Sequence, residues 1–197
     1  TWAQHQTGHG SLGGDWFEVE PELIDKSDPD CVWRSKEVLR KPKGDKAAVP
    51  TVIHQIWSPV KAMVIFMKLH LPLRTYQVRM LDSGEADTWR YENGQWVVNT
   101  QHDFVLGSEK RPFGKGVFRR IHDTMTGLYS TGLYINTNKT ADQNKDELER
   151  GYIIPWQNEE MLYWLEKLRN WQEKYNPIVK PTDCTALLKK HTVNKKS

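Results

Sequence analysis

The chain of 197 residues has a net charge of +3, and its composition includes 27% charged residues and nine tryptophans. This length suits one compact domain that can bury a core without disulfides or metals. The aromatic content of 11% excludes an intrinsically disordered chain. No run of about 20 apolar residues is present, so we expect no transmembrane segment.

Composition predicts three regions: a lead-in rich in Gly and His over 1–14, a single domain over 15–179, and a basic tail over 180–197. We expect both ends to be mobile because they offer little apolar surface to bury. The tail has five Lys and one Asp, a net charge of +4, so the rest of the chain is nearly neutral. The basic character of the protein is therefore mainly a property of its tail.

The two cysteines, Cys31 and Cys184, are too far apart in sequence for a metal-binding pair. In an exported protein they would form one long-range bridge, whereas in a reducing compartment they would stay free thiols. The chain begins at Thr1 without a methionine, which favours the removal of an upstream segment. If that segment was a secretory signal, the expected location is periplasmic or extracellular; otherwise the compartment stays open.

The first elements are expected around the apolar stretch that follows a Pro- and Gly-containing loop over 41–50. Thr51–Trp57 is rich in β-branched residues and predicts a strand. Val60–Leu71 fits either a helix with one polar edge or a strand, because both periodicities can be traced through it. Thr75–Leu81 alternates apolar and polar residues, which predicts a further strand.

The clearest local pattern is a β-hairpin over Thr88–Val98. Asn93-Gly94 is the dipeptide that accepts a positive φ at both central positions of a type I′ turn. A two-residue turn here fixes the register of the flanking strands. The expected pairs are Glu92 with Gln95, Tyr91 with Trp96, and Trp89 with Val98.

The remaining expected elements are two strands followed by two helices. A loop over 100–116 precedes two expected strands, over 116–122 and 127–137. A capping box that begins at Thr140 predicts a helix that ends near Arg150, with Gly151 as its cap. A second helix is expected from Asn158 to Tyr175, because Asn158 is a good N-cap and Pro177 follows.

These elements predict an α+β fold with an antiparallel, meander-like sheet over 49–137. We expect the two C-terminal helices to cover one face of that sheet. Apolar residues recur along the second helix at spacings of three and four, which gives it one face for packing.

One short segment resembles a known family. Val49–Trp57, with the sequence VPTVIHQIW, resembles the opening strand of glycosyltransferases that carry a DXD sugar motif. In that family the Asp-x-Asp motif follows the strand. Here the corresponding residues, Asp28-Pro29-Asp30, precede it, so the resemblance assigns no site residues.

The sequence contains no motif that assigns an active site. The histidines and cysteines have no metal-binding spacing, and no phosphate-binding glycine loop is present, so we expect neither a metal nor a cofactor. The best acid–base set consists of two His-Asp dipeptides, which would have to converge in the fold: His102, Asp103, His122 and Asp123. Whether the chain is an enzyme stays open, with the pattern favouring a non-enzymatic protein.

The absence of catalytic motifs, together with the many Trp and Tyr residues, favours a protein-binding or inhibitor domain. A bacterial accessory or toxin-neutralising, immunity-type protein would suit this size. Its partner would be another protein, because Trp, Tyr and Arg anchor protein interfaces. The candidate contact residues are Trp89, Tyr91, Trp96, Arg119 and Arg120.

Two alternatives remain beside this interpretation. One is an enzyme that uses the scattered His and Asp residues. The other is a nucleic-acid or membrane-surface binder that uses a basic patch next to Phe113 and Phe118; its cations are Lys110, Arg111, Lys115, Arg119 and Arg120. Nucleic acid is the less favoured partner because the net charge is small, and the oligomeric state stays open.

Overall fold

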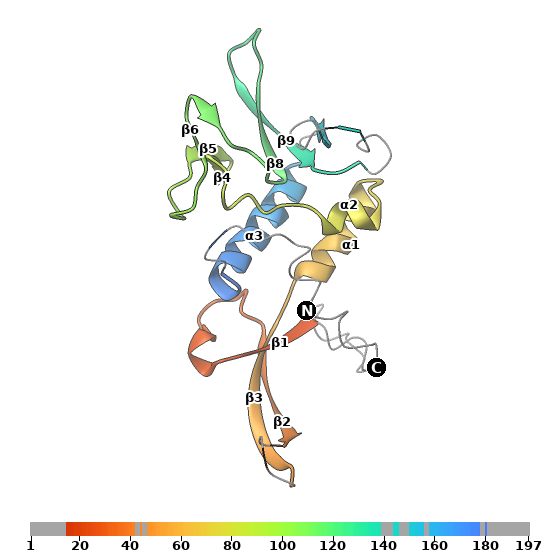
Figure 1. Ribbon diagram of the computed structural model, residues 1–197, viewed down its shortest axis with the longest axis vertical. Helices are drawn as coiled ribbons and strands as arrows, with labels where there is room; N and C mark the ends of the chain where they lie inside the picture. Colours follow the sequence, from red (N-terminus) through yellow and green to blue (C-terminus); the bar gives the residue numbers. More distant parts are fainter. Residues whose placement is uncertain are drawn as a thin grey trace. The chain divides into compact units, whose positions relative to one another are not determined.

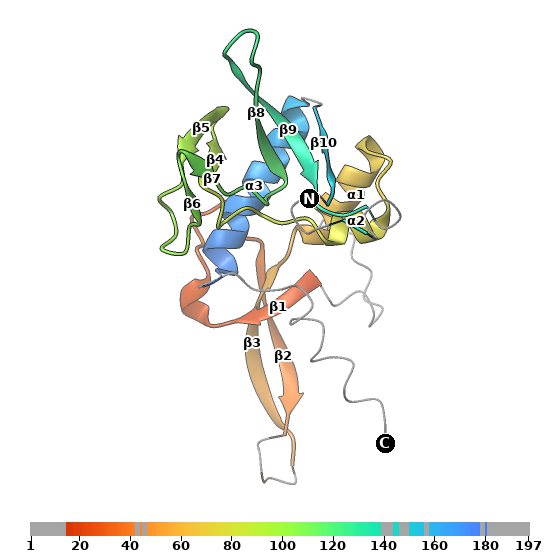
Figure 2. The same ribbon diagram turned by 45° about the horizontal axis from the view of Figure 1, so that its top comes forward.

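The computed structural model describes residues 15–41, 44, 47–138, 144–145, 150–155, 158–177 and 180. Contacts between residues divide the protein into two compact units, the first ending at Met63 and the second beginning at Val64. Figures 1 and 2 show the helices and strands that make up each unit.

The first unit is built on a three-stranded antiparallel sheet in the order β1-β3-β2. Its strands are β1 (Trp16–Val19), β2 (Trp33–Arg40) and β3 (Val49–Trp57); a 3-10 turn, η3 (Pro21–Leu23), follows β1. Ile56 on β3 lies opposite Phe17 and Trp33 and is fully buried. The predicted strand over Thr51–Trp57 is therefore confirmed.

β3 begins two residues earlier than expected and includes Pro50. A proline has no N–H to donate, so it is tolerated in a strand only where a neighbour is missing. The pairing of β1 with β3 stops at His54, and at Pro50 only β2 lies alongside. The proline thus lies where β3 has a free edge.

Several expectations lie outside the described residues. Cys31 is buried in the first unit, but Cys184 is outside the described ranges, so their bridge stays a prediction. The lead-in over 1–14 and, apart from Lys180, the basic tail over 180–197 are also outside them. The expected helix over 140–150 falls mostly on such residues.

The segment left open between helix and strand is a helix, α1 (Val60–His70). Met63, Met67 and Leu71 recur every four residues and are buried, which is helical spacing. Ile65 and Leu69 are exposed, at 62% and 79%.

The strand predicted over Thr75–Leu81 is wrong, because this segment forms a short helix, α2 (Thr75–Arg79). The contacts of Gln77 favour a helix over a strand in this segment. The side-chain oxygen of Gln77 accepts a hydrogen bond from the backbone N–H of Arg74 (3.0 Å), which satisfies an N–H at the start of the helix. Its Nε2 donates to the carbonyl oxygen of Thr137 (3.1 Å) and to the Tyr152 hydroxyl (3.3 Å). The local alternation of apolar and polar residues carries no information about these tertiary contacts.

The predicted hairpin is confirmed as β4 (Trp89–Glu92) and β5 (Gln95–Val98), with the expected register. Asn93 and Gly94 have φ angles of 49° and 80°, as a type I′ turn requires. Two further short strands, β6 (Gly107–Ser108) and β7 (Arg111–Pro112), pair within the segment expected to be a loop.

The main sheet of the second unit is antiparallel, in the order β10-β9-β8. It consists of β8 (Phe118–His122), β9 (Tyr129–Ile135) and β10 (Tyr152–Ile154), and the β8–β9 turn is the expected one. Leu133 and Ile135 on β9 are almost fully buried. Figure 1 shows the β8–β9 hairpin extending well beyond α3, which lies beside its base.

The last helix, α3 (Glu159–Tyr175), matches the sequence prediction. The side-chain oxygen of Asn158 accepts from the backbone N–H of Met161 (2.9 Å), which caps the helix as expected. Its buried face includes Met161 and Leu165, but it also includes Arg169, which is only 5% exposed. No helix within the described ranges has the length and hydrophobicity needed to cross a bilayer.

The α+β class and the antiparallel pairing are confirmed, and a C-terminal helix packs on the sheet. Within the described residues, the strands do not form one continuous meander, because they are divided among four small sheets. The two strands of each hairpin pair with each other, and the long connections between hairpins contain α1, α2 and loops. Those connections separate the hairpins from one another.

Replacing Gly132 on β9 with alanine should destabilise the protein. A Cβ at this position would lie 2.7 Å from Ile121 Cδ1 and 2.8 Å from the Ile154 carbonyl oxygen, so β10 would have to move. Such overpacking costs about 1–3 kcal/mol. Urea unfolding of Gly132→Ala checks this expectation, with Ser130→Ala on the same strand as the control. Equal midpoints for the two variants would contradict it.

Candidate nucleic-acid interface

Two neighbouring cavities in the second unit, of about 490 and 530 Å³, share four lining residues: Phe113, Lys115, Tyr134 and Arg150. We call the two cavities together the basic groove. The first is completed by residues of α2, of the segment that follows it and of the end of β9: Tyr76, Met80, Asp82, Asn136 and Thr137. The second is completed by residues around β7, β8 and β10: Pro112, Gly114, Arg119, Gly151, Tyr152 and Ile153.

Three cations line the basic groove, Lys115, Arg119 and Arg150, against one acid, Asp82. None of the ion pairs between described residues involves any of the three cations. The hydrogen bonds of the two arginines go to carbonyl oxygens, which do not neutralise their charge, and the buried Asp87 interacts electrostatically with Arg119. The basic groove is therefore suited to an anion.

Lys115 is held at the groove by its backbone. Asp87 is 6% exposed, and its carboxylate accepts hydrogen bonds from the N–H groups of Lys115 (2.6 Å) and Gly116 (2.9 Å). Gly116 packs so closely that a Cβ would lie 2.6 Å from the Cα of Gly84. Burial raises the pKa of Asp87 to about 6, and the two N–H groups oppose that rise.

Arg119 reaches the basic groove because of its place on β8. It lies opposite Gly132 of β9, and its guanidinium stacks over the Tyr134 ring at 4.1 Å. One guanidinium nitrogen also donates to the carbonyl oxygen of Gly114 (3.0 Å). The Tyr134 hydroxyl donates to the carbonyl oxygen of Arg150 (2.7 Å), which joins the wall of the groove to the segment before β10.

Arg120 lies elsewhere, although the sequence places it next to Arg119. Adjacent residues of a strand point to opposite faces. The Arg120 guanidinium lies 3.9 Å from the Trp89 ring and 3.5 Å from the Tyr129 ring. The two arginines that the sequence suggested as one contact patch are thus on different faces of the sheet.

The hairpin aromatics make contacts within the second unit. Tyr91 stacks on Phe118 at 5.2 Å and meets Trp96 edge to face at 5.6 Å. The Trp96 indole N–H donates to the Thr131 hydroxyl (2.8 Å). These contacts attach the hairpin to β8 and β9. The role of Trp89, Tyr91 and Trp96 in binding stays a prediction.

The two His-Asp dipeptides make separate contacts, although the adjacent residues His122 and Asp123 interact electrostatically. His102 stacks on Phe104 and bonds to Glu173, whereas His122 stacks on Tyr129. Asp123 accepts from the Thr126 hydroxyl and the Met125 N–H, which hold its pKa below its usual range and close the β8–β9 turn. Asp103 is exposed. The acid–base set stays a prediction that no contact supports.

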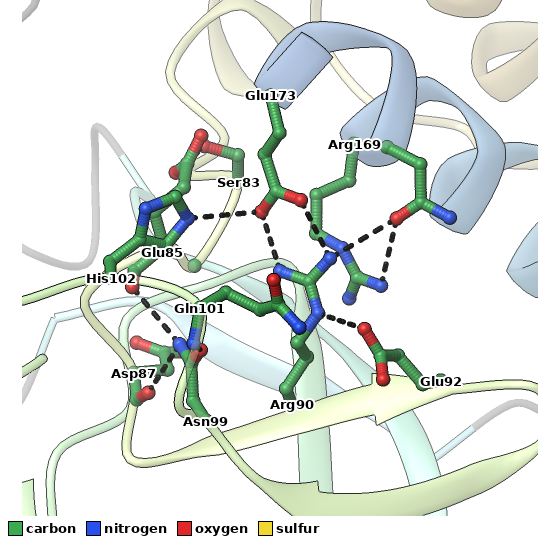
Figure 3. A network of polar contacts seen from close by, with 12 residues as sticks. Ser83, Glu85, Asp87, Arg90, Glu92, Asn99, Gln101, His102, Arg169 and Glu173 are labelled. Atoms are coloured by element: carbon green, nitrogen blue, oxygen red, sulfur yellow. Dashed lines mark hydrogen bonds and ion pairs between the residues drawn. The ribbon is translucent and has the colours of Figure 1, made fainter. Parts of the chain in front are cut away.

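A buried polar network lies between β4 and α3 (Figure 3). Arg90 is 7% exposed, and its guanidinium makes two parallel hydrogen bonds to the Glu173 carboxylate, of 2.5 and 2.6 Å. Its Nε donates to Glu92 (2.5 Å), and the Nε2–H of His102 donates to Glu173 (3.2 Å). Arg169 shares the side-chain oxygen of Asn170 with Arg90.

The pKa values of Arg90, Arg169 and Glu173 in this network are shifted in different directions. Burial acts to lower the pKa of Arg90, but the hydrogen bonds to Glu173 and Glu92 raise it above its usual value. Burial and the neighbouring Arg90 lower the pKa of Arg169. Burial acts to raise the pKa of Glu173, yet its bonds to Arg90 and His102 hold it below its usual range. Glu173 is therefore the central anion of the network.

Sequence reasoning identified Lys115 and Arg119 as part of a basic patch but missed the rest of the basic groove. Tyr76 had been placed in a strand, and nothing local connects Tyr152 or Arg150 to Lys115. These residues meet only after β10 pairs with β9 and α2 binds the end of β9. Among the described residues, no cluster of three His, Cys, Asp or Glu side chains could hold a metal ion.

Glu173→Gln should destabilise the protein because it leaves two buried arginines with less negative charge. Breaking a buried pair by removing one partner costs roughly 3–5 kcal/mol, and we expect about 3 because Glu92 still pairs with Arg90. Chemical denaturation measures this loss. Glu160→Gln, an exposed change on the same helix, is the control, and an equal stability of the two variants would refute the expectation.

The stability of the protein should depend on the protonation of Asp87. Its folded pKa is raised from 3.8 to about 6, so the folded state binds this proton more tightly than the unfolded state. This contribution is complete below pH 3.8 and is lost as the pH rises through about 6. Relative to Asp87→Asn, the unfolding free energy should fall by roughly 3 kcal/mol across that range. Parallel stability curves for the two proteins would contradict the expectation.

A family model described as "Putative integrase" matches residues 1–185 of the chain. No curated protein and no solved structure matches. The match contradicts the prediction of a protein-binding, immunity-type domain, because it indicates a function related to DNA recombination instead. The nucleic-acid alternative fits this finding better, and nothing supports the expected bacterial immunity role.

Proposed function

The chain belongs to this integrase family, and we propose from this membership that it contacts DNA during recombination through the basic groove of its second unit. The observation that carries the proposal is the set of three groove cations without an ion-pair partner among the described residues. One acid, Asp82, lines the first of the two cavities.

DNA is a chain of phosphates, and its affinity for proteins comes largely from Lys and Arg side chains that replace condensed counterions. The three groove cations differ in how they can contact a phosphate. Arg119 is fixed over a tyrosine ring, so its charge has a defined position. Lys115 has a fixed backbone and a flexible side chain, which allows its ammonium to follow a phosphate.

The low net charge of +3 does not oppose this proposal. Inside the second unit, several acidic residues are neutralised by internal partners. Glu173 and Glu92 pair with Arg90, for example, so they add little negative potential at the groove. Local charge at the contact surface decides DNA affinity more than the sum over the chain does.

The test is the salt dependence of DNA binding. We expect log affinity for a duplex to fall linearly with log salt concentration, and Lys115→Gln to reduce the magnitude of that slope by about 1. The loss of affinity should be similar for unrelated DNA sequences, because a phosphate contact carries no base information. Fluorescence anisotropy at several salt concentrations measures both effects.

Lys167→Gln is the matched control because it removes the same charge from a lysine that lines a different cavity, beside Tyr163 and Glu166. This variant should keep the slope of the wild-type protein. Equal effects of the two substitutions would place the DNA contact outside the basic groove. Absence of DNA binding at low salt would reject the proposed function altogether.

A further inference from the structure

The size of the basic groove limits what can enter it. Each of its two cavities has a volume of about 500 Å³, the range of sites that hold small molecules. A DNA duplex is far larger, since its major groove alone admits a whole α-helix. A duplex can therefore lay phosphates along the rim, but only an unpaired nucleotide can place its base inside.

Each cavity presents one exposed aromatic ring. Tyr76 at the start of α2 is 54% exposed and lines the first cavity, and Tyr152 on β10 is 37% exposed and lines the second. Tyr134 differs, because it is 8% exposed and Arg119 covers its ring. Exposed rings beside cations are the arrangement with which proteins bind single strands, by stacking on bases and pairing with phosphates.

The first cavity also offers a hydrogen-bond acceptor. The Asp82 carboxylate is exposed and lines this cavity, and one of its oxygens also receives the Gly84 N–H (2.7 Å). Acceptors match the exocyclic amino groups of adenine and cytosine, which are donors.

We propose that the basic groove holds unpaired nucleotides of a DNA strand, with a base stacked on Tyr76 and the neighbouring phosphates at Lys115 and Arg150. This inference rests on the proposed DNA contact and adds the state of the DNA that the groove recognises. The Asp82 carboxylate, which is exposed in the same cavity, receives an amino group of the inserted base. Such a site selects DNA at a gap or a melted junction over a continuous duplex.

The experiment uses the full chain and two DNAs of identical length and sequence, one fully paired and one with a short single-stranded gap. A fluorescent 2-aminopurine in the gap reports stacking because its emission is quenched when it stacks. We expect the gapped DNA to bind at least ten-fold more tightly, and the 2-aminopurine emission to fall on binding.

Tyr76→Leu keeps an apolar side chain but removes the ring. It should weaken binding of the gapped DNA by five-fold or more and abolish the quenching, with a clearly smaller loss for the paired DNA. Tyr76→Phe should retain the wild-type behaviour because it keeps the ring. Tyr163→Leu removes a similarly exposed ring, 56% exposed, from a different cavity, and should have no effect.

The possible results separate the two proposals. Equal affinity for paired and gapped DNA, or quenching that persists in Tyr76→Leu, would overturn the inference and leave the DNA contact intact. Failure of the wild-type chain to bind either DNA would overturn both. Thermal unfolding of Tyr76→Leu verifies that this variant folds. If Tyr76→Leu does not fold, Lys115→Gln is the second variant, and it should weaken binding of both DNAs.

Discussion

The pair of hydrogen bonds between Arg90 and Glu173 joins two parts of the second unit that are far apart in sequence. Arg90 lies on β4 in the middle of the chain, and Glu173 lies near the end of α3. Both are largely buried, and an isolated buried charge would be very costly. Each therefore requires the other, which fixes the β4–β5 hairpin against α3 and adds His102 from the following loop.

The basic groove depends on the segment immediately before Arg90. Asp87 precedes β4 and binds the backbone of Lys115, while the Asn99 side chain donates to the carbonyl oxygens of Glu85 (3.0 Å) and Asp87 (2.9 Å). Figure 3 shows the hydrogen bonds from Asn99 to Glu85 and Asp87. Asn99 directly follows β5, so these bonds join the segment that holds Lys115 to the β4–β5 hairpin.

The predictable parts of this protein are the local ones. The Asn93-Gly94 turn dictates the hairpin register because only a few residues accept a positive φ at both positions. The start of α3 was predictable because Asn158 caps it through its own side chain. In contrast, α2 was mistaken for a strand, because the contacts of Gln77 that favour a helix come from Thr137 and Tyr152.

By itself, the sequence determined the α+β class, the β4–β5 and β8–β9 hairpins and the last helix, since each hairpin and the helix depend on interactions between residues close in the chain. It also placed Lys115 and Arg119 in a basic patch, but it could not say which face of the sheet each cation occupies. Only the tertiary structure decided that Arg119 lies at a groove with Arg150 and that Arg120 lies between Trp89 and Tyr129. The reason is that a site assembled from α2, β8, β9 and β10 exists only once long-range pairing and burial have brought those elements together.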